Sequence, residues 1–84
     1  MKPIRLSAHA SRYTGKRGFT VAEVEDAIRN SLWQAAELGR LECRKEFPFN
    51  GEWNKKVYAT KQVRPIFVEE ADEIVVVTVY TYYW

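Results

Sequence analysis

The chain has 84 residues, of which 46% are hydrophobic and 29% are charged, and its net charge is +2. These totals are typical of one small globular domain, and no apolar run is long enough to cross a membrane. A lone cysteine, Cys43, excludes an internal disulfide, and no Cys/His cluster is present for a structural zinc ion. The first residues lack the hydrophobic region of a signal peptide. We therefore expect a single domain over residues 1–84 in the cytoplasm, with no metal and no cofactor.

Two helices are predicted in the first third of the sequence. Ser7 is a good N-cap residue, which predicts a first helix over about residues 7–16. Thr20 and Glu23 have the spacing of a capping box, in which each side chain accepts a hydrogen bond from the other residue's backbone N–H. Apolar residues then recur at helical spacing, which predicts a second helix over about residues 20–31.

The remaining sequence is predicted to form antiparallel strands. Residues 33–38 stay ambiguous, because they suit either an extension of the second helix or a first strand that Gly39-Arg40 would end in a hairpin turn. Pro65 cannot donate to a strand ladder, so it marks the start of a strand or a bulge. Extended segments are expected at residues 4–6, 41–47, 53–61 and 66–69, a loop at 48–52, and a hairpin turn at 70–73.

The last segment, residues 74–84, carries the clearest strand pattern of the chain. It is filled by β-branched and aromatic residues and contains no Gly, Pro or charge. Both of its alternating faces begin apolar, which places this strand centrally in a sheet. One face continues through Thr78, Tyr80 and Tyr82, so it ends in either a wet groove or a partner surface. The predicted fold is α+β, with two N-terminal helices packed on an antiparallel sheet of about four strands.

Charge is distributed unevenly along the chain. Residues 1–20 carry five basic side chains and no acid, and residues 43–65 are basic again. If these two segments meet in the fold, they form a positive face suited to phosphate groups, and RNA becomes a candidate partner. The alternative is a solvated surface of mixed charge, which the modest net charge equally allows.

The candidate catalytic residues are His9, Arg12, Arg64 and Tyr80. His9 is the only histidine, and imidazole is the side chain that exchanges protons near neutral pH. Arginine guanidinium groups can clamp a phosphate with two parallel hydrogen bonds, and a tyrosine can supply a hydroxyl for acid–base work. The alternative for His9 is a structural role, either capping or packing on the helix.

Further residues are candidates for contact with nucleic acid. Cations can hold the phosphates, and tyrosine rings can stack on unpaired bases. The alternative for the tyrosines is a half-buried place in the sheet, and for the cations a pairing with carboxylates. These nucleic-acid-binding candidates are Lys16, Arg17, Lys56, Tyr58 and Tyr82.

Three stretches, Ser7 to Arg12, Lys16 to Ile28 and Ile74 to Tyr80, resemble a large bacterial family of small domains of unknown function. That family is in turn distantly similar to the RelE- and BrnT-type toxins, compact α+β proteins that cleave RNA and are silenced by an antitoxin. The resemblance implies a metal-independent endoribonuclease or an inactive relative, and an antitoxin partner. The residues that lie on the matching motif are His9, Arg12, Arg17 and Thr78-Val79-Tyr80.

Two other functions remain open at this point. The chain could be a non-catalytic module that binds RNA or DNA through its basic face. It could instead be a small protein-interaction module that docks a partner, or a second copy in a homodimer, through its aromatic C-terminal strand.

Overall fold

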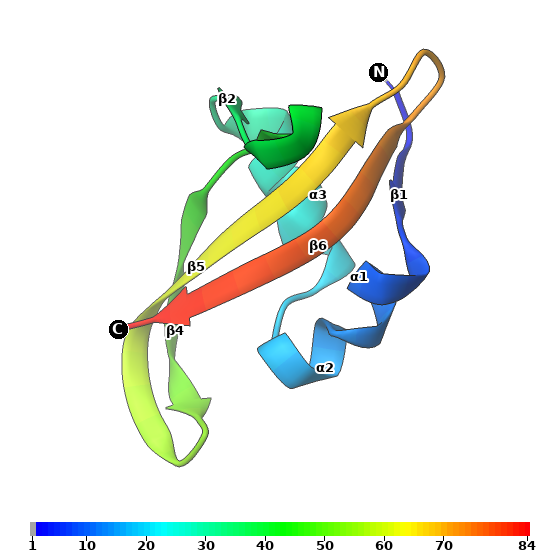
Figure 1. Cartoon of the computed structure of the whole chain (residues 1–84). Helices are drawn as coiled ribbons and strands as arrows, with labels where there is room; N and C mark the ends of the chain where they lie inside the picture. The colour runs from blue at the N-terminus through cyan, green and yellow to red at the C-terminus, as the bar shows by residue number, and fades with distance from the viewer. Residues whose placement is uncertain (1) are drawn as a thin grey trace.

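The computed structural model describes residues 2–84 and shows an α+β protein, as predicted, with three α-helices and a six-stranded mixed sheet (Figure 1). The helices are α1 (Ala8–Arg12), α2 (Thr14–Arg17) and α3 (Val21–Asn30), and a 3₁₀ turn, η1, covers Glu37–Gly39. The strands are β1 (Ile4–Leu6), β2 (Gln34–Ala35), β3 (Leu41–Glu42), β4 (Lys45–Trp53), β5 (Lys56–Glu69) and β6 (Ile74–Tyr83).

The last strand was predicted to lie inside the sheet, and it has a strand on each side over residues 74–76. The strand order is β1-β6-β5-β3-β2, and β4 pairs with β5 as well. β1 runs parallel to β6, so the prediction of a wholly antiparallel sheet of about four strands is wrong. β1 ends where Leu6 pairs with Val76, and from that point β6 has a strand neighbour on one side only.

The helices begin where the sequence predicted, but the first predicted helix is divided. The Ser7 side chain accepts a hydrogen bond from the Ala10 N–H and caps α1, which ends before Tyr13, and α2 follows directly. Both halves of the Thr20–Glu23 capping box are formed at the start of α3. The buried side of α3 packs on the sheet, and it consists of Val24, Ala27 and Ile28.

A bulge in β6 changes which side chains face the core. Val76 pairs with Phe67 and Thr78 pairs with Ile66, so Val77 has no partner on β5. An unpaired extra residue reverses the alternation of side chains along a strand. Val76 and Val79 therefore both belong to the core, and the prediction of two unbroken alternating faces is wrong at this point.

The central part of the chain holds longer strands than predicted. The expected loop at residues 48–52 lies within β4, which absorbs its irregularity as a register shift between Pro48 and Gly51. The hairpin turn comes later, at Asn54 and Lys55, so the predicted strand over residues 53–61 begins too early. Residues 33–38 form neither a long strand nor a helix extension, but contribute the two-residue strand β2 and the beginning of η1.

Pro65 occupies a central strand because its missing N–H faces a gap. It stands opposite Val79, and its carbonyl accepts a hydrogen bond from Cys43, which lies between β3 and β4. On this side β5 pairs first with β4 and then with β3, and Pro65 lies between the two paired segments. No hydrogen bond to a neighbouring strand is therefore required from its nitrogen. Cys43 is buried there, and this burial raises the pKa of its thiol to about 11.

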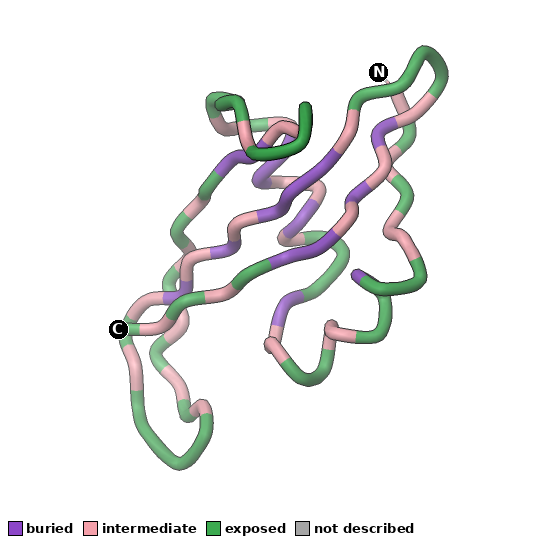
Figure 2. The backbone as a smooth tube through the Cα atoms, viewed as in Figure 1, coloured by how far each residue is buried: buried purple, intermediate pink, exposed green. Residues whose placement is uncertain are grey.

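The core lies between α3 and the middle of the sheet, where the buried segments of β5, β6 and α3 gather (Figure 2). The far end of the sheet is closed by a second group of side chains, Phe49, Trp53, Tyr58 and Tyr83. The Trp53 and Tyr83 rings stack with their centroids 5.1 Å apart. The Tyr83 hydroxyl donates a hydrogen bond to the Arg17 carbonyl at 3.1 Å, which ties this group to the end of α2.

Gly18 permits this contact, and its replacement gives the first test of the fold. It has φ +74°, and a Cβ there would meet the Tyr83 hydroxyl and come within 2.7 Å of the Trp53 ring. Gly18→Ala is expected to lower the free energy of unfolding by about 2 to 4 kcal/mol, from backbone strain together with overpacking. Urea unfolding measures the change.

Gly39 is the matched control for this substitution. It has φ +72°, but a Cβ there would have no neighbour within 4 Å. Gly39→Ala should therefore cost only the backbone term of about 1 kcal/mol. Equal costs for the two variants would show that the contact between Gly18 and the aromatic group contributes nothing to stability.

Candidate functional site

The face of the sheet opposite α3 carries an open groove of about 590 Å³. Its floor comes from the side chains of β3, β5 and β6 that point away from the core, and one wall comes from the turn around η1. The predicted polar continuation of one β6 face does line a groove, because Thr78, Tyr80 and Tyr82 all border it. The other lining residues are Ala35, Ala36, Glu37, Leu38, Arg40, Glu42, Arg64 and Ile66.

Arg64 lies in the groove, as predicted, but a carboxylate occupies its guanidinium group. Its Nε donates to Glu42 at 2.6 Å and its Nη2 donates to the other carboxylate oxygen at 3.1 Å. The hydrogen bonds to Arg64 lower the pKa of the Glu42 carboxyl, and those to Glu42 raise the pKa of Arg64. The Glu42 carboxylate neutralises the charge of Arg64 and takes two of its five N–H donors, which weakens the predicted catalytic role of Arg64 as a phosphate clamp.

The third guanidinium nitrogen of Arg64 contacts the groove tyrosines. Its Nη1 lies 3.3 Å from the Tyr82 hydroxyl, and its guanidinium carbon lies 5.6 Å from the centre of the Tyr80 ring. A cation at this distance from an aromatic ring is attracted to it. Arg64 therefore positions the two groove tyrosines, and Glu42 holds Arg64.

Arg17 also approaches Tyr80. Its Nη1 donates to the Val79 carbonyl at 2.8 Å and to the Thr78 hydroxyl at 3.1 Å, across the edge that β1 leaves free. Its guanidinium carbon lies 5.1 Å from the centre of the Tyr80 ring. No carboxylate lies within ion-pair distance of Arg17 anywhere in residues 2–84, so its positive charge remains available to a ligand.

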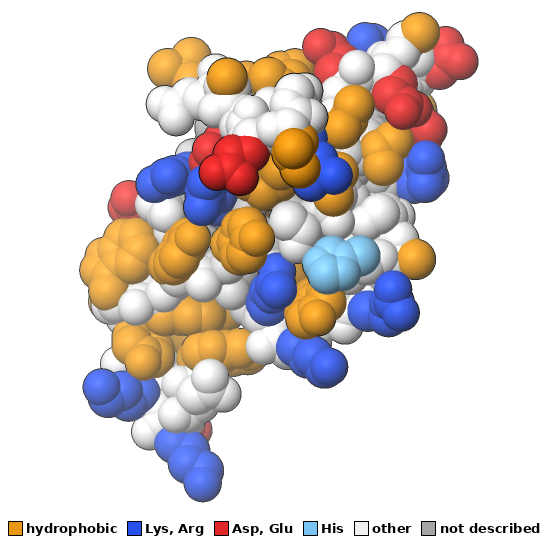
Figure 3. Space-filling view, in the orientation of Figure 1, with side chains coloured by type: hydrophobic (Ala, Val, Ile, Leu, Met, Phe, Trp, Pro, Cys, Tyr) orange, Lys and Arg blue, Asp and Glu red, His pale blue; other side chains and the backbone are white. Residues whose placement is uncertain are grey.

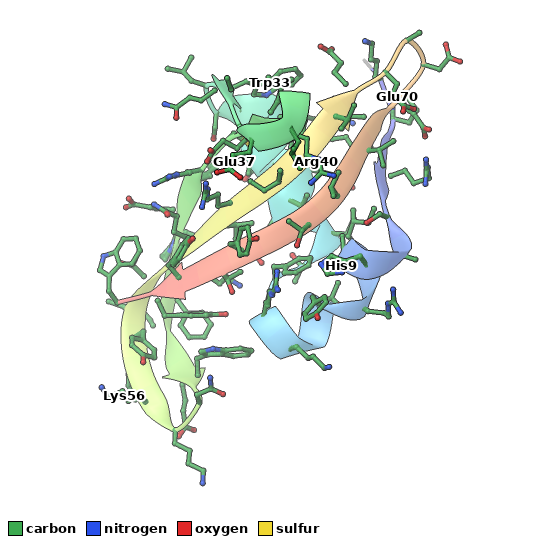
Figure 4. The ribbon with its side chains drawn as sticks, viewed as in Figure 1. His9, Trp33, Glu37, Arg40, Lys56 and Glu70 are labelled. Atoms are coloured by element: carbon green, nitrogen blue, oxygen red, sulfur yellow. The ribbon has the colours of Figure 1, made fainter. Side chains whose placement is uncertain are left out.

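His9 joins this arrangement through Tyr13. The centroids of the His9 and Tyr13 rings are 4.7 Å apart. The guanidinium carbon of Arg17 lies over the Tyr13 ring, 4.2 Å from its centre. His9 is exposed and faces the viewer in Figures 3 and 4, on the side of the molecule that carries the η1 turn. A continuous series of side chains thus leads from the imidazole to the groove, in the order His9, Tyr13, Arg17 and Tyr80.

Arg12, the remaining predicted catalytic residue, is not brought into this series. Its Nε donates back to the Ala8 carbonyl of its own helix at 3.3 Å, and the side chain is exposed. Lys16 lies beside the series, with its Nζ 5.5 Å from the centre of the Tyr13 ring. Lys16 is therefore placed for contact with an anion at the site, and Arg12 is not.

Lys56 and Tyr58 are separated from the groove. Figure 4 shows Lys56 at the β4–β5 end of the molecule, far from His9. The Tyr58 ring packs 5.7 Å from Tyr83, in the aromatic group at the end of α2. These two candidates for nucleic-acid contact therefore do not share a surface with Tyr80 and Tyr82.

The predicted positive face is also reduced by ion pairs. Cations from both basic segments pair with acids that are distant in sequence, namely Lys2 with Glu69, Arg5 with Glu73, Lys45 with Asp26 and Lys61 with Glu23. Arg40, which was not among the predicted site residues, has no carboxylate within ion-pair distance in the described chain, and it lies in front of β5 and β6 in Figure 4. The positive charge at the site therefore comes from Lys16, Arg17 and Arg40.

One signal in the sequence could have identified Tyr13. It lies four residues after His9 and four before Arg17, the spacing that puts side chains on one side of a helix. Glu42 and Arg40 carried no such local signal, because their places in the groove depend on the pairing of β3 with β5.

No helix within residues 2–84 is both long and apolar enough to cross a membrane. In the same residues, no three side chains of His, Cys, Asp or Glu gather in a way that could hold a metal ion. Models of known protein families, curated proteins and solved structures were each compared with the chain, and none matched. The resemblance to the bacterial domain family and to the toxins therefore stays a prediction.

The Glu42–Arg64 pair predicts a specific dependence of stability on pH. Hydrogen bonding to Arg64 lowers the pKa of Glu42 from its ordinary value of 4.5, so the pair stabilises the fold above that value. This contribution is lost as the pH falls through the pKa of the folded state. Glu42→Gln should lower the free energy of unfolding at neutral pH by about 1 to 3 kcal/mol, because Arg64 loses its ionic partner.

The difference between the wild type and Glu42→Gln should therefore shrink as the pH is lowered below the ordinary carboxyl value. Urea unfolding at a series of pH values measures it. Glu46→Gln is the control, because Glu46 is exposed on β4 and has no ion pair within residues 2–84. A difference that stays constant with pH would show that the carboxylate charge is not what stabilises the groove.

Proposed function

We propose that this chain binds single-stranded RNA across the open face of its sheet and cleaves it with its own side chains. The observation that carries this proposal is the series from His9 through Tyr13 and Arg17 to Tyr80. It combines an exposed imidazole, a half-buried guanidinium that has no carboxylate within ion-pair distance in the described chain, and an exposed tyrosine. These are the groups that phosphodiester cleavage by RNA's own 2′-hydroxyl needs.

The chemistry follows from what each group can do. The 2′-hydroxyl attacks the adjacent phosphorus, the bond to the 5′-oxygen breaks, and a cyclic phosphate and a free 5′-hydroxyl result. His9 or Tyr80 accepts the proton of the attacking hydroxyl or supplies one to the leaving oxygen. Negative charge gathers on the phosphate oxygens in the transition state, and the free guanidinium donors of Arg17 stabilise it.

Binding draws on the exposed tyrosines of β6. Tyr80 and Tyr82 are 40% and 41% exposed, and both border the groove. Aromatic rings stack on unpaired bases with little regard to sequence, while cations at the rim follow the phosphates. Lys16, Arg17 and Arg40 supply those cations.

A non-catalytic nucleic-acid-binding module would use the same surface, and it is distinguished only by the absence of cleavage. Docking of a protein through the aromatic C-terminal strand has less support. Tyr83 is taken up by its contacts with Trp53 and the end of α2, so the aromatic residues of this strand do not form one free patch. A toxin role with an antitoxin partner rests on the family resemblance alone.

Removal of the imidazole tests the catalytic part of the proposal. His9→Ala should reduce the rate of cleavage of a single-stranded RNA by about 100-fold or more, because a positioned acid or base contributes on this scale. Gel analysis of end-labelled RNA, in buffer containing a chelator, measures the rate. Thermal unfolding should show a stable fold, since His9 is exposed.

Arg12→Ala is the matched control, since Arg12 lies one helical turn from His9 but outside the series of side chains. It should cleave at the wild-type rate. If the wild type binds RNA and leaves it intact, the non-catalytic module replaces the nuclease. If His9→Ala cleaves at the wild-type rate, the assignment of His9 is wrong.

Salt dependence tests the binding part of the proposal. With the three rim cations contacting phosphates, the logarithm of the association constant should fall with the logarithm of salt concentration at a slope of about −2. Lys16→Ala should make this slope shallower by about 0.7, because one phosphate contact is lost. Fluorescence anisotropy with a labelled RNA measures both.

Lys56→Ala is the control for the salt experiment. Lys56 carries the same charge as Lys16 but lies at the β4–β5 end of the molecule, away from His9 (Figure 4). Its replacement should leave the slope unchanged. If Lys56→Ala alters the slope and Lys16→Ala does not, RNA binds at the β4–β5 hairpin and not at the groove.

A further inference from the structure

Two tight turns in this chain have consecutive positive φ values and different residues at their first position. Asn54 and Lys55 connect β4 to β5 with φ values of 50° and 67°. Leu38 and Gly39, in the connection from β2 to β3, have φ values of 60° and 72°. Consecutive positive φ values define type I′ turns, in which Asn, Asp or Gly is the favoured first residue. Asn54 obeys this preference and Leu38 does not.

Leu38 gains no burial in return for its backbone strain. A residue other than Gly in the left-handed region is destabilised, and a leucine lacks the short polar side chain that relieves this strain in Asn. Its side chain is 84% exposed, so the core provides no compensation. A local conflict that nothing in the fold offsets points to a function of the side chain itself.

The place of Leu38 indicates what that function is. Its side chain lines the same groove as Tyr80, Tyr82 and Ile66, as part of the wall that rises beside the sheet. The space between this wall and the sheet is within the range of pockets that hold small ligands. Any flat group that enters the groove therefore meets an apolar side chain on the wall and tyrosine rings on the floor.

Arg40 gives the wall beside Leu38 a positive charge that can meet a phosphate, and Glu37 on the same wall carries a negative charge. Arg40 follows two residues later, borders the groove, and has no carboxylate within ion-pair distance in the described chain. Glu42, by contrast, is neutralised by Arg64. A flat ring joined to a phosphate satisfies both the apolar pair of surfaces and the free guanidinium, and a nucleotide unit of a single strand is such a group.

We propose that Leu38 and the two groove tyrosines form a base-binding subsite, in which one unpaired base of the RNA is enclosed and Arg40 holds its phosphate. This inference rests on the proposed function and names where that site holds its substrate. Leu38 closes over one side of the base and the tyrosine rings contact the other. Tyr80 lies between His9 and the subsite. The subsite therefore holds a nucleotide next to the bond that is cleaved.

Leu38→Asn is the decisive substitution, because stability and binding should change in opposite directions. Asn relieves the strain of the turn, so the melting temperature should rise by about 4 °C. Binding is compared between two labelled RNAs of equal length whose 2′-hydroxyls are replaced by fluorine to prevent cleavage, one of them abasic at a central position. The wild type should bind the intact RNA at least about 5-fold more tightly than the abasic RNA, and Leu38→Asn should lose this preference.

Asn54→Leu is the matched control. It places the same unfavourable residue in the same turn type, far from the groove, so the melting temperature should fall and the preference for the intact RNA should remain. Leu38→Gly provides a second variant that suits the turn and removes the side chain. It should lose the base preference as Leu38→Asn does.

The outcomes separate this inference from the proposed function. If neither RNA binds at low salt, both fail. If RNA binds with the expected salt dependence but Leu38→Asn and Leu38→Gly keep the base preference, the subsite is wrong and the RNA-binding face stands. If the two variants weaken binding of the intact and abasic RNAs equally, Leu38 contacts the backbone of the strand and the base-binding subsite is again wrong.

Discussion

The architecture depends on how the free edge of β6 is closed. β1 covers that edge only as far as Val76, and beyond it the backbone groups of β6 would face solvent. The corner formed by Arg17 and Gly18 takes the place of a strand there. The Arg17 guanidinium donates to the Val79 carbonyl, and its own carbonyl accepts hydrogen bonds from Thr81 and Tyr83. The end of α2 is thus fixed to β6 by one bond to its backbone and two bonds from its side-chain hydroxyls, and this contact requires glycine at position 18.

The same corner places the proposed chemistry. Because Arg17 must reach the edge of β6, its guanidinium also lies beside Tyr80, and Tyr13 and His9 follow at one-turn spacing along the preceding helices. Opposite, the Glu42–Arg64 pair fixes the tyrosines from the β5 side. The site is therefore supported by contacts that also hold the sheet together, which favours rigid placement of its side chains.

Features that depend on adjacent residues were predictable, and features that depend on pairing were not. The capping box located the start of α3, and the composition of residues 74–84 identified a strand within the sheet. The bulge at Val77 reverses which side chains of β6 face the core. It was not predictable, because it arises only from the pairing of β6 with β5. Pro48 and Gly51 resembled a loop because both normally interrupt strands, yet pairing with β5 holds them in β4. The Glu42 partner of Arg64 is 22 residues away in the sequence and had no local signal.

The irregularity in β4 has a consequence for how the protein behaves among its own copies. β4 is a long outer strand, and a regular strand in that position would offer a row of unpaired N–H and C=O groups to another chain. Pro48 removes one donor, the left-handed Asn50 turns the backbone aside, and charged residues flank both. The outer edge of β4 is thereby a poor template for the addition of a strand from another copy, which opposes the growth of a fibre from this edge.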